Sequence, residues 1–264
     1  MSAKNNVQDE CGDSAAEYWP TEPTPRFAKG TRNDIWIGQA EASFPHLGEL
    51  DLLAHDLRNP LAAISLEAAL VGERLGQADH EAMRRGLHRI QRNAEYLARM
   101  VEDLLDLGAI DHGHLRIRHA PTELRGLLEQ VIDRAIAPVD RGRVILDAPQ
   151  PITVTIDAVR IERVVANLLQ NALKYAPGQS TVVALGLARG LARVSVADEG
   201  PGIDPAEQTS IFDKYQRGTT AGASEGCGLG LYVSRCIVEA HGGHIAVEGR
   251  RGGGSCFYFE LPLG

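Results

Sequence analysis

Apolar residues in two long stretches of the first half of the chain recur at alternating steps of four and three. The first series is Leu50, Ala54, Leu57, Leu61, Ile64, Ala68, Val71 and Leu75, and the second is Met83, Leu87, Ile90, Ala94, Leu97, Val101 and Leu104. This spacing is typical of helices that pack along one another. It predicts a helix over about 44–75, a short turn at 76–79, and a second helix that ends near Gly108.

Two helices joined by so short a turn must lie antiparallel as neighbours. A lone pair leaves one side of each apolar stripe in water, so the hairpin needs a further partner. A homodimer that forms a four-helix bundle supplies one. The alternative is a monomeric hairpin that the C-terminal part of the same chain covers.

Beyond residue 115 the period changes, and short strands alternate with helices. The expected helices are 122–139, a helix capped by Asp157 that reaches Tyr175, and 229–240; the expected strands are 143–146, 152–156, 181–187, 192–197, 244–248 and 256–261. Strands clustered in this way with interspersed helices predict a two-layer α+β sandwich.

Residues 1–43 are polar and contain Pro20, Pro23 and Pro25, which predicts a mostly disordered N-terminal tail. The formal net charge of -8 argues against nucleic acid as a partner, because such binding depends on basic residues. No apolar run is long enough to span a bilayer, and no signal peptide is recognisable. The four cysteines include no CxxC pair. We therefore expect a cytoplasmic protein with reduced thiols and no membrane insertion.

The first predicted helix carries a chemically unusual group of residues at its centre. His55 lies one position past a seam residue and should point outward, and Asn59 shares its face one turn later. Pro60 has no N–H to donate to the carbonyl of Asp56, so the helix is expected to bend or open there. The pattern predicts an exposed imidazole flanked by a carboxylate and a carboxamide.

A second group lies on the helix that Asp157 caps. Asn167, Asn171 and Lys174 follow one another at steps of four and three, so they share one helical face. Carboxamide oxygens suit a hard Mg²⁺ ion, and an ammonium group can neutralise phosphate. On these three residues alone, a polar stripe facing solvent is the simpler interpretation.

Two glycine-rich segments follow. Asp198-Glu199-Gly200-Pro201-Gly202 comes directly after an apolar strand, where glycines allow a close approach and a carboxylate can accept a hydrogen bond from an exocyclic amine. Gly226-Cys227-Gly228-Leu229-Gly230 opens a helix, where backbone N–H groups can meet phosphate. It is not a Walker A loop, because no GK[ST] follows. The polar connection 203–225, with an apolar plug at Ile211-Phe212, fits a mobile cover or a plain surface loop.

Together these segments resemble the motifs of sensor histidine kinases. The stretch His55-Asp56-Leu57-Arg58-Asn59-Pro60-Leu61 resembles the H-box, residues 167–175 the N-box, 198–202 the G1 box, 211–218 the F-box and 226–230 the G2 box. The resemblance covers 44–264. It implies a dimerisation and histidine phosphotransfer hairpin at 44–115 and a catalytic ATP-binding domain of the Bergerat type at 116–264.

The resemblance also implies roles for single residues. His55 would accept the phosphoryl group, Asp56 would act as general base or orienting group, and Asn59 would position water for phosphatase activity. Asn171 would bind Mg²⁺ and Asp198 would bind adenine. The implied nucleotide-binding residues are Asn167, Asn171, Lys174, Tyr175, Asp198, Gly200, Gly202, Phe212, Gly226, Gly228, Leu229 and Gly230.

The implied function is an ATP- and Mg²⁺-dependent protein histidine kinase. It would phosphorylate itself on His55 and pass the phosphoryl group to an aspartate in the receiver domain of a response regulator, with a separate sensor protein as a possible further partner. The alternative is a dimeric phosphotransfer or scaffold hub whose ATPase-like domain only docks regulators. A serine kinase or chaperone-like ATPase of the same fold would lack the hairpin with its exposed histidine.

Overall fold

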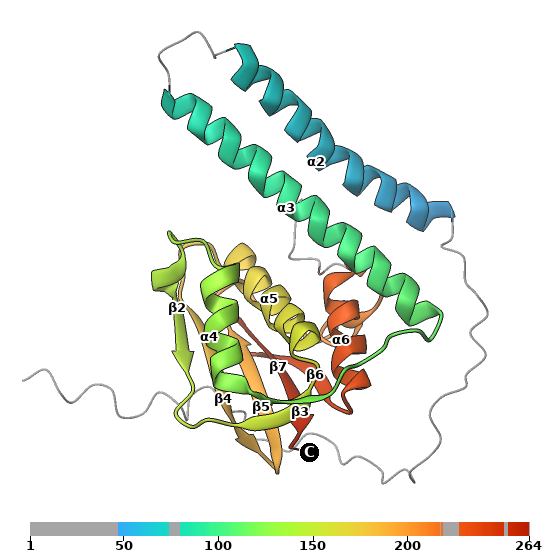
Figure 1. The fold of residues 1–264 in the computed structure, drawn as a ribbon, viewed down its shortest axis with the longest axis vertical. Helices are drawn as coiled ribbons and strands as arrows, with labels where there is room; N and C mark the ends of the chain where they lie inside the picture. The colour runs from blue at the N-terminus through green and yellow to red at the C-terminus, as the bar shows by residue number, and fades with distance from the viewer. Residues whose placement is uncertain (1–46, 74–79, 217, 219–226, 251–252, 264) are drawn as a thin grey trace, which may run out of the picture.

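The computed structural model describes residues 47–73, 80–216, 218, 227–250 and 253–263, without the side chains of residues 47–55 and 73. The predicted N-terminal tail, the turn at 76–79 and Gly226 lie outside these residues. Within the described part, a long helical hairpin stands against a sheet-and-helix domain (Figure 1). None of the described helices is long and apolar enough to cross a membrane.

The hairpin consists of α2 (Leu47–Glu73) and α3 (His80–Asp111), which run side by side (Figure 1). Arg89 fixes their register by donating to both carboxylate oxygens of Glu67, at 2.6 and 2.9 Å. α2 continues through Pro60 as one helix, so the predicted opening beside His55 is not observed.

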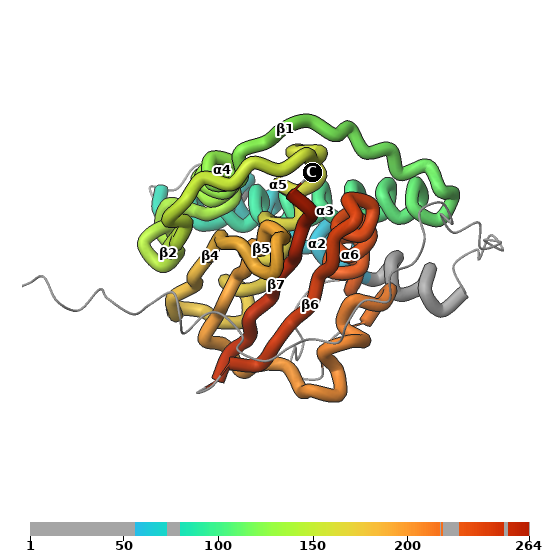
Figure 2. Tube along the Cα trace, turned by 90° about the horizontal axis from the view of Figure 1, so that it is seen from below, coloured from blue at the N-terminus to red at the C-terminus, as the bar shows by residue number. Residues whose placement is uncertain are grey.

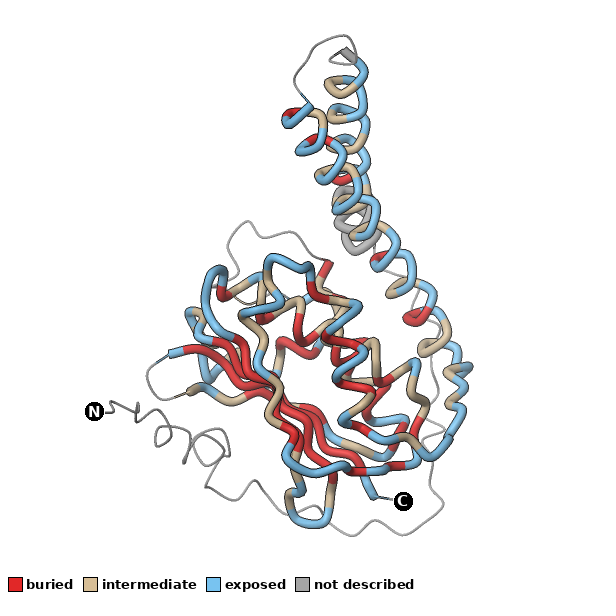
Figure 3. The backbone as a smooth tube through the Cα atoms, turned by 60° about the vertical axis from the view of Figure 1, so that its left-hand side comes forward, coloured by how far each residue is buried: buried red, intermediate tan, exposed pale blue. Residues whose placement is uncertain are grey.

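Several large apolar side chains of the hairpin remain exposed in the single chain. They are Leu61, Leu66, Leu87, Val101 and Leu105. Figure 3 shows the contrast with the sandwich domain, where buried residues concentrate in the sheet and in the helices that face it. Exposed apolar area of this kind is unfavourable in water, so the hairpin has a face that a partner would stabilise.

The second domain is the predicted α+β sandwich. Its main sheet has the order β2-β4-β5-β7-β6, with β2 parallel to β4 and the other pairs antiparallel. The strands are β2 (Val144–Asp147), β4 (Thr181–Ala188), β5 (Leu191–Ala197), β6 (His244–Gly249) and β7 (Ser255–Pro262). Helices α4 (Leu124–Ala135), α5 (Ala158–Tyr175) and α6 (Gly230–Ala240) lie together on one face of this sheet (Figure 2). One apolar core fills the space between the two layers.

The first part of the sandwich domain differs from its prediction. A strand, β1 (Ala120–Glu123), pairs with β3 (Thr153–Ile156), and α4 is shorter than the predicted helix 122–139. α4 starts at Leu124 because the Glu123 carboxylate accepts hydrogen bonds from the N–H groups of the first turn. The predicted strand 143–146 begins one residue later, after a short 3-10 turn.

The start of α5 is tied to the end of α6. Asp157 caps α5, as predicted: its carboxylate accepts hydrogen bonds from the backbone N–H of Arg160 and of Arg118. The N–H of Asp157 donates to Nε2 of His241 at 3.0 Å, and Nδ1 of His241 lies 2.7 Å from the carbonyl oxygen of Ile237. The buried imidazole is therefore neutral, with its proton on Nδ1.

We expect this histidine to make the domain less stable in acid. Burial lowers the pKa of His241, and the ring of His119 nearby adds to the effect, while Ile237 and Asp157 oppose it. Because the unfolded chain binds a proton at a higher pH than the folded one, stability is full above about pH 6.5 and is lost as the pH falls through the folded-state pKa. Thermal unfolding between pH 5 and 8 measures this.

The control variants separate proton binding from packing. His241→Gln keeps an acceptor for Asp157 but cannot titrate, so its melting temperature should be lower at pH 8 and should depend less on pH. His244→Gln changes an exposed histidine three residues away and should keep the wild-type pH profile. An unchanged acid sensitivity in His241→Gln would assign the effect to other groups.

Candidate nucleotide site

A cavity of about 1550 Å³ opens between α5, the glycine-rich segments and α3. This volume exceeds that of an ordinary small-molecule pocket, about 300–1,000 Å³. Three sets of predicted residues contribute to its lining: Asn167, Asn171, Lys174 and Tyr175; Asp198 and Gly202; and Gly228, Leu229 and Gly230. The structure thus brings motifs that are far apart in the sequence to one cavity.

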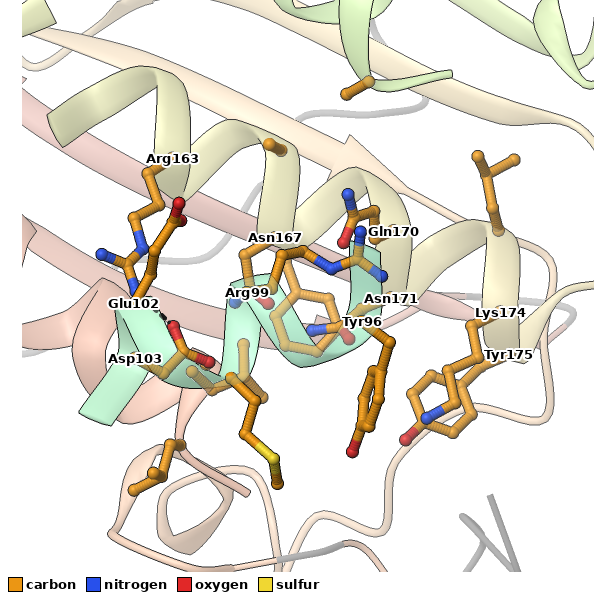
Figure 4. A pocket seen from close by; sticks show the side chains of 18 of the residues that line it. Tyr96, Arg99, Glu102, Asp103, Arg163, Asn167, Gln170, Asn171, Lys174 and Tyr175 are labelled. Atoms are coloured by element: carbon orange, nitrogen blue, oxygen red, sulfur yellow. Dashed lines mark hydrogen bonds and ion pairs between the residues drawn. The ribbon is translucent and has the colours of Figure 1, made fainter. Parts of the chain in front are cut away.

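The α5 wall carries the polar stripe that the spacing predicts. Asn167, Asn171 and Lys174 lie along one side of the helix, with Tyr175 beside them (Figure 4). The Lys174 ammonium lies 5.1 Å from the centre of the Tyr175 ring. α5 is amphipathic: Val164, Val165 and Leu168 on its other side are fully buried in the core, which holds the polar side at the cavity.

Asp198 is buried at the end of β5. Its Oδ1 accepts hydrogen bonds from the N–H groups of Gly200 (2.8 Å) and Ser255 (3.3 Å). Burial raises the pKa of this carboxyl group, against the opposing effects of the two N–H groups and of Arg250. Asp198 therefore presents a carboxylate that its own loop orients, with Oδ2 as the remaining acceptor.

Two glycines let the Asp198 loop pass close to the start of β7. Gly254 has φ +89°, and a Cβ there would overlap the carbonyl oxygen of Asp198. Gly202 has φ +79°, and a Cβ there would lie 3.3 Å from the Gly254 carbonyl oxygen. A side chain at position 254 would be strained by its φ and would push the loop away, so this close approach requires glycine.

The third wall leads into α6. Gly228 has φ +68°, and a Cβ there would lie 2.6 Å from the carbonyl oxygen of Gln216. The carbonyl of Gly228 accepts a hydrogen bond from Tyr215 N at 3.1 Å. This pairing joins the described end of the 203–216 segment to the start of the G2 segment. Of the intervening connection, residues 217 and 219–226 are outside the described part.

Some predicted site residues lie elsewhere. Phe212 is 4% exposed and packs in the core, with its ring edge-to-face against Phe257 at 6.3 Å between centroids. It is not among the residues that line the cavity, whereas its neighbour Ile211 is. Gly200 also does not line the cavity, but its N–H orients Asp198.

The hairpin forms a wall that the sequence did not predict. Tyr96 and Arg99 of α3 face the polar stripe of α5 across the cavity (Figure 4). Neither residue belongs to a recognisable motif, and only the packing of the two domains brings them to Asn171. The large volume of the cavity follows from this shared wall.

Ion pairs hold α3 against α5 beside the cavity. Asp106, which is buried, pairs with both Arg160 and Arg163, and Arg163 also pairs with Asp103 at 2.5 Å. Burial raises the pKa of Asp103, and the carboxylate of Asp106 adds to the rise, whereas the hydrogen bond from Arg163 lowers it. We call these four residues the interdomain clamp.

An apolar contact lies next to the clamp. Met100 and Leu107 of α3 are buried against Cys227 and Leu229 of the G2 segment, with Leu57 of α2 packed at the edge. Burial raises the pKa of the Cys227 thiol to about 11, so this cysteine is an unreactive thiol near neutral pH. The described residues of the G2 segment therefore contact both α3 and, through Leu57, the predicted H-box of α2.

The predicted H-box lies on α2 within this contact region. The backbone of His55 is helical, and its side chain is outside the described part. By the antiparallel register that Glu67 and Arg89 define, His55 lies level with about residue 101 of α3, within two turns of the clamp. Asp56 is half-buried and Asn59 is exposed.

The chemistry of the lining suits a nucleotide with its metal. Asn167 and Asn171 offer amide oxygens of the kind that Mg²⁺ accepts alongside phosphate oxygens and water. Lys174 supplies a positive charge, and α6 begins at the cavity with its N-terminal, positive dipole end. The residues present therefore fit a magnesium-bound polyphosphate with a buried acceptor, Asp198, at the other wall.

Comparisons with known proteins agree with this arrangement. The family model described as the His Kinase A (phospho-acceptor) domain matches residues 49–113. The family model described as histidine kinase-, DNA gyrase B-, and HSP90-like ATPase matches residues 156–264. The two matches correspond to the hairpin and to most of the sandwich domain.

Relatives of known name cover the same region. The adaptive-response sensory kinase SasA of Synechococcus sp. (strain JA-3-3Ab) is 35% identical over 220 residues, 81% of this chain and 58% of that protein. The sensor protein KdpD of Escherichia coli (strain K12) is 34% identical over 218 residues, 81% of this chain and 24% of that protein. The chain thus spans between a quarter and three fifths of the length of these relatives.

A solved structure shares the fold. Full-length ShkA, crystallised in complex with AMPPNP, is 26% identical, with a TM-score of 0.56 over 81% of this chain and 45% of that chain. With a phosphoacceptor hairpin, an ATP-binding sandwich domain and sensory kinases as relatives, the chain belongs to the sensor histidine kinase family.

Proposed function

We propose that this protein is an ATP-dependent histidine kinase that phosphorylates itself on His55 and transfers the phosphoryl group to an aspartate of a response regulator. The observation that carries the proposal is the packing of the nucleotide cavity against the hairpin at the level of His55. It brings a candidate phosphoryl donor site and a candidate acceptor into one assembly.

In the proposed reaction a nitrogen of the neutral His55 imidazole attacks the γ-phosphorus of ATP. The new P–N bond forms as the bond to the β,γ-bridging oxygen breaks, and ADP leaves with that electron pair. Imidazole needs little activation near neutral pH. Asp56, on the next position of the helix, would fix which ring nitrogen carries the proton.

The remaining groups would bind and orient the nucleotide. Asp198 would accept a hydrogen bond from the adenine amine, and Tyr175 would contact the nucleotide from the end of α5. Asn171 would bind Mg²⁺, which neutralises phosphate charge when bound, and Lys174 would add a second positive charge. Catalysis of this kind depends mainly on positioning and charge neutralisation.

The hairpin would serve two further roles. Its exposed apolar residues, Leu61, Leu87 and Val101 among them, support a homodimer in which two hairpins form a four-helix bundle. Asn59 is exposed one turn after His55, where it could orient water on a bound regulator. We therefore include phosphatase activity toward the regulator in the proposal.

The test is incorporation of label from γ-labelled ATP in the presence of Mg²⁺. The protein should acquire a phosphoryl group that acid releases and alkali does not, and His55→Gln should remove it completely. His88→Gln is the matched control, because it changes another exposed histidine of the hairpin and should retain the label.

Other outcomes would point elsewhere. An acid-stable label would indicate a serine kinase, and nucleotide binding without any label would indicate a docking hub. Transfer to a purified receiver domain, with loss in its Asp→Asn variant, tests the second half of the proposal.

A further inference from the structure

Ser234 of α6 is a buried polar residue that connects α6 to the polar stripe of α5. It is 2% exposed. Its Oγ lies 2.8 Å from the carbonyl oxygen of Gly230 and 3.0 Å from Nδ2 of Asn167. No motif identifies this residue, and it does not line the cavity itself.

The two hydrogen bonds of Ser234 determine which way the Asn167 amide points. A serine hydroxyl has one proton, and a carbonyl oxygen can only accept, so Ser234 donates to Gly230. The Oγ of Ser234 must therefore accept its other hydrogen bond, the one from Nδ2 of Asn167. The NH₂ group of the Asn167 amide therefore points toward Ser234, and its Oδ1 points away from Ser234.

The Oδ1 of Asn167 lies at the N-terminus of α6. A Cβ at Gly230 would come within 2.6 Å of this oxygen, so glycine makes room for it. In the described part of the chain Oδ1 has no hydrogen-bond partner, although Asn167 lines the cavity. An oxygen in this place repels phosphate oxygens and attracts a cation or the protons of its bound water.

We infer that Ser234 is a positioning residue for magnesium: by holding the NH₂ end of Asn167, it presents the amide oxygen to the hydrated Mg²⁺ that accompanies the nucleotide. The inference rests on the nucleotide site of the proposed function but not on phosphoryl transfer. If the amide turned over, NH₂ would face the metal, and a hydrogen-bond donor cannot replace an oxygen there. Partners that orient a metal's ligands in this way typically contribute about 10- to 100-fold in affinity.

The experiment compares binding of AMPPNP to the full chain with Mg²⁺ and with EDTA, by calorimetry. In Ser234→Ala nothing holds the amide, so the gain in affinity that Mg²⁺ gives should fall by about 10-fold or more. Binding without Mg²⁺ should stay at the wild-type value. Ser234→Thr keeps the hydroxyl and should restore the gain. Ser195→Ala removes a serine that is similarly buried in β5, away from the cavity, and should behave as wild type.

A second pair of variants distinguishes orientation from packing. Asn167→Asp has an oxygen at both ends, so adding Ser234→Ala should cost no further Mg²⁺-dependent affinity. A magnesium gain that survives in Ser234→Ala would overturn the inference, and so would equal losses with and without the metal. A protein that binds AMPPNP with Mg²⁺ as expected, yet never acquires label on His55, would contradict the proposed function and leave this inference standing.

Discussion

Replacing Asp198 by asparagine should weaken ATP binding by about 10- to 100-fold while leaving the domain folded. Oδ1 of Asp198 accepts from Gly200 and Ser255, and an asparagine oxygen can accept both of these hydrogen bonds. The second oxygen becomes NH₂. If this position meets the amine of adenine, two donors face each other in a buried site, and neither can be satisfied.

Fluorescence titration with an adenine nucleotide, together with thermal unfolding, checks this prediction. Asp204→Asn is the matched control. Its carboxylate also accepts from a backbone N–H two residues later, that of Ala206 at 2.8 Å, but it is exposed and does not line the cavity. If Asp198→Asn bound ATP as tightly as the control, adenine would have to be recognised by another group. A similar loss for GTP and ATP would also contradict a contact to the adenine amine.

The sequence predicts best those elements in which the period of the apolar residues agrees with the capping residues at the ends. α5 runs from Ala158 to Tyr175 as expected, because Asp157 is a good cap and the apolar residues follow the helical period without a break. β1 was missed because Ala120-Pro121-Thr122-Glu123 has no alternation and contains proline. It is a strand only because β3 offers a partner, which is a tertiary effect.

The cavity shows a similar division. Motif residues of α5, Asp198 and the glycines converge as expected, since each lies at the end of a strand or on one face of a helix. Phe212 does not, because the local pattern cannot tell an apolar plug over a ligand from one in the core, where this ring meets Phe257. The sequence did not predict roles for Arg99 and Ser234. Arg99 reaches the cavity only because α3 packs against α5 across the domain boundary, and Ser234 matters only through its contact with α5 from α6.

Breaking the interdomain clamp at Asp106 should separate the nucleotide cavity from the hairpin. Asp106→Arg places a third guanidinium beside Arg160 and Arg163 in a poorly solvated contact, where like charges repel strongly. Amide hydrogen exchange should rise in the two segments that meet there, residues 100–107 and 227–229. Asp106→Asn keeps the shape but loses the charge, so it should have a smaller effect in the same direction.

The same variants should also slow phosphorylation of His55. Because in-line transfer requires close positioning, misplacing the donor domain should cost about 10-fold or more in rate, while ATP binding persists. Arg125→Ala is the control: its ion pair with Glu129 is exposed, where such pairs contribute little, and neither residue lines the cavity. Asp106 does not line the cavity, so a change in rate at constant nucleotide affinity can be assigned to domain placement. Faster phosphorylation in Asp106→Arg would reverse the interpretation, because the clamp would then hold the ATPase domain away from the histidine.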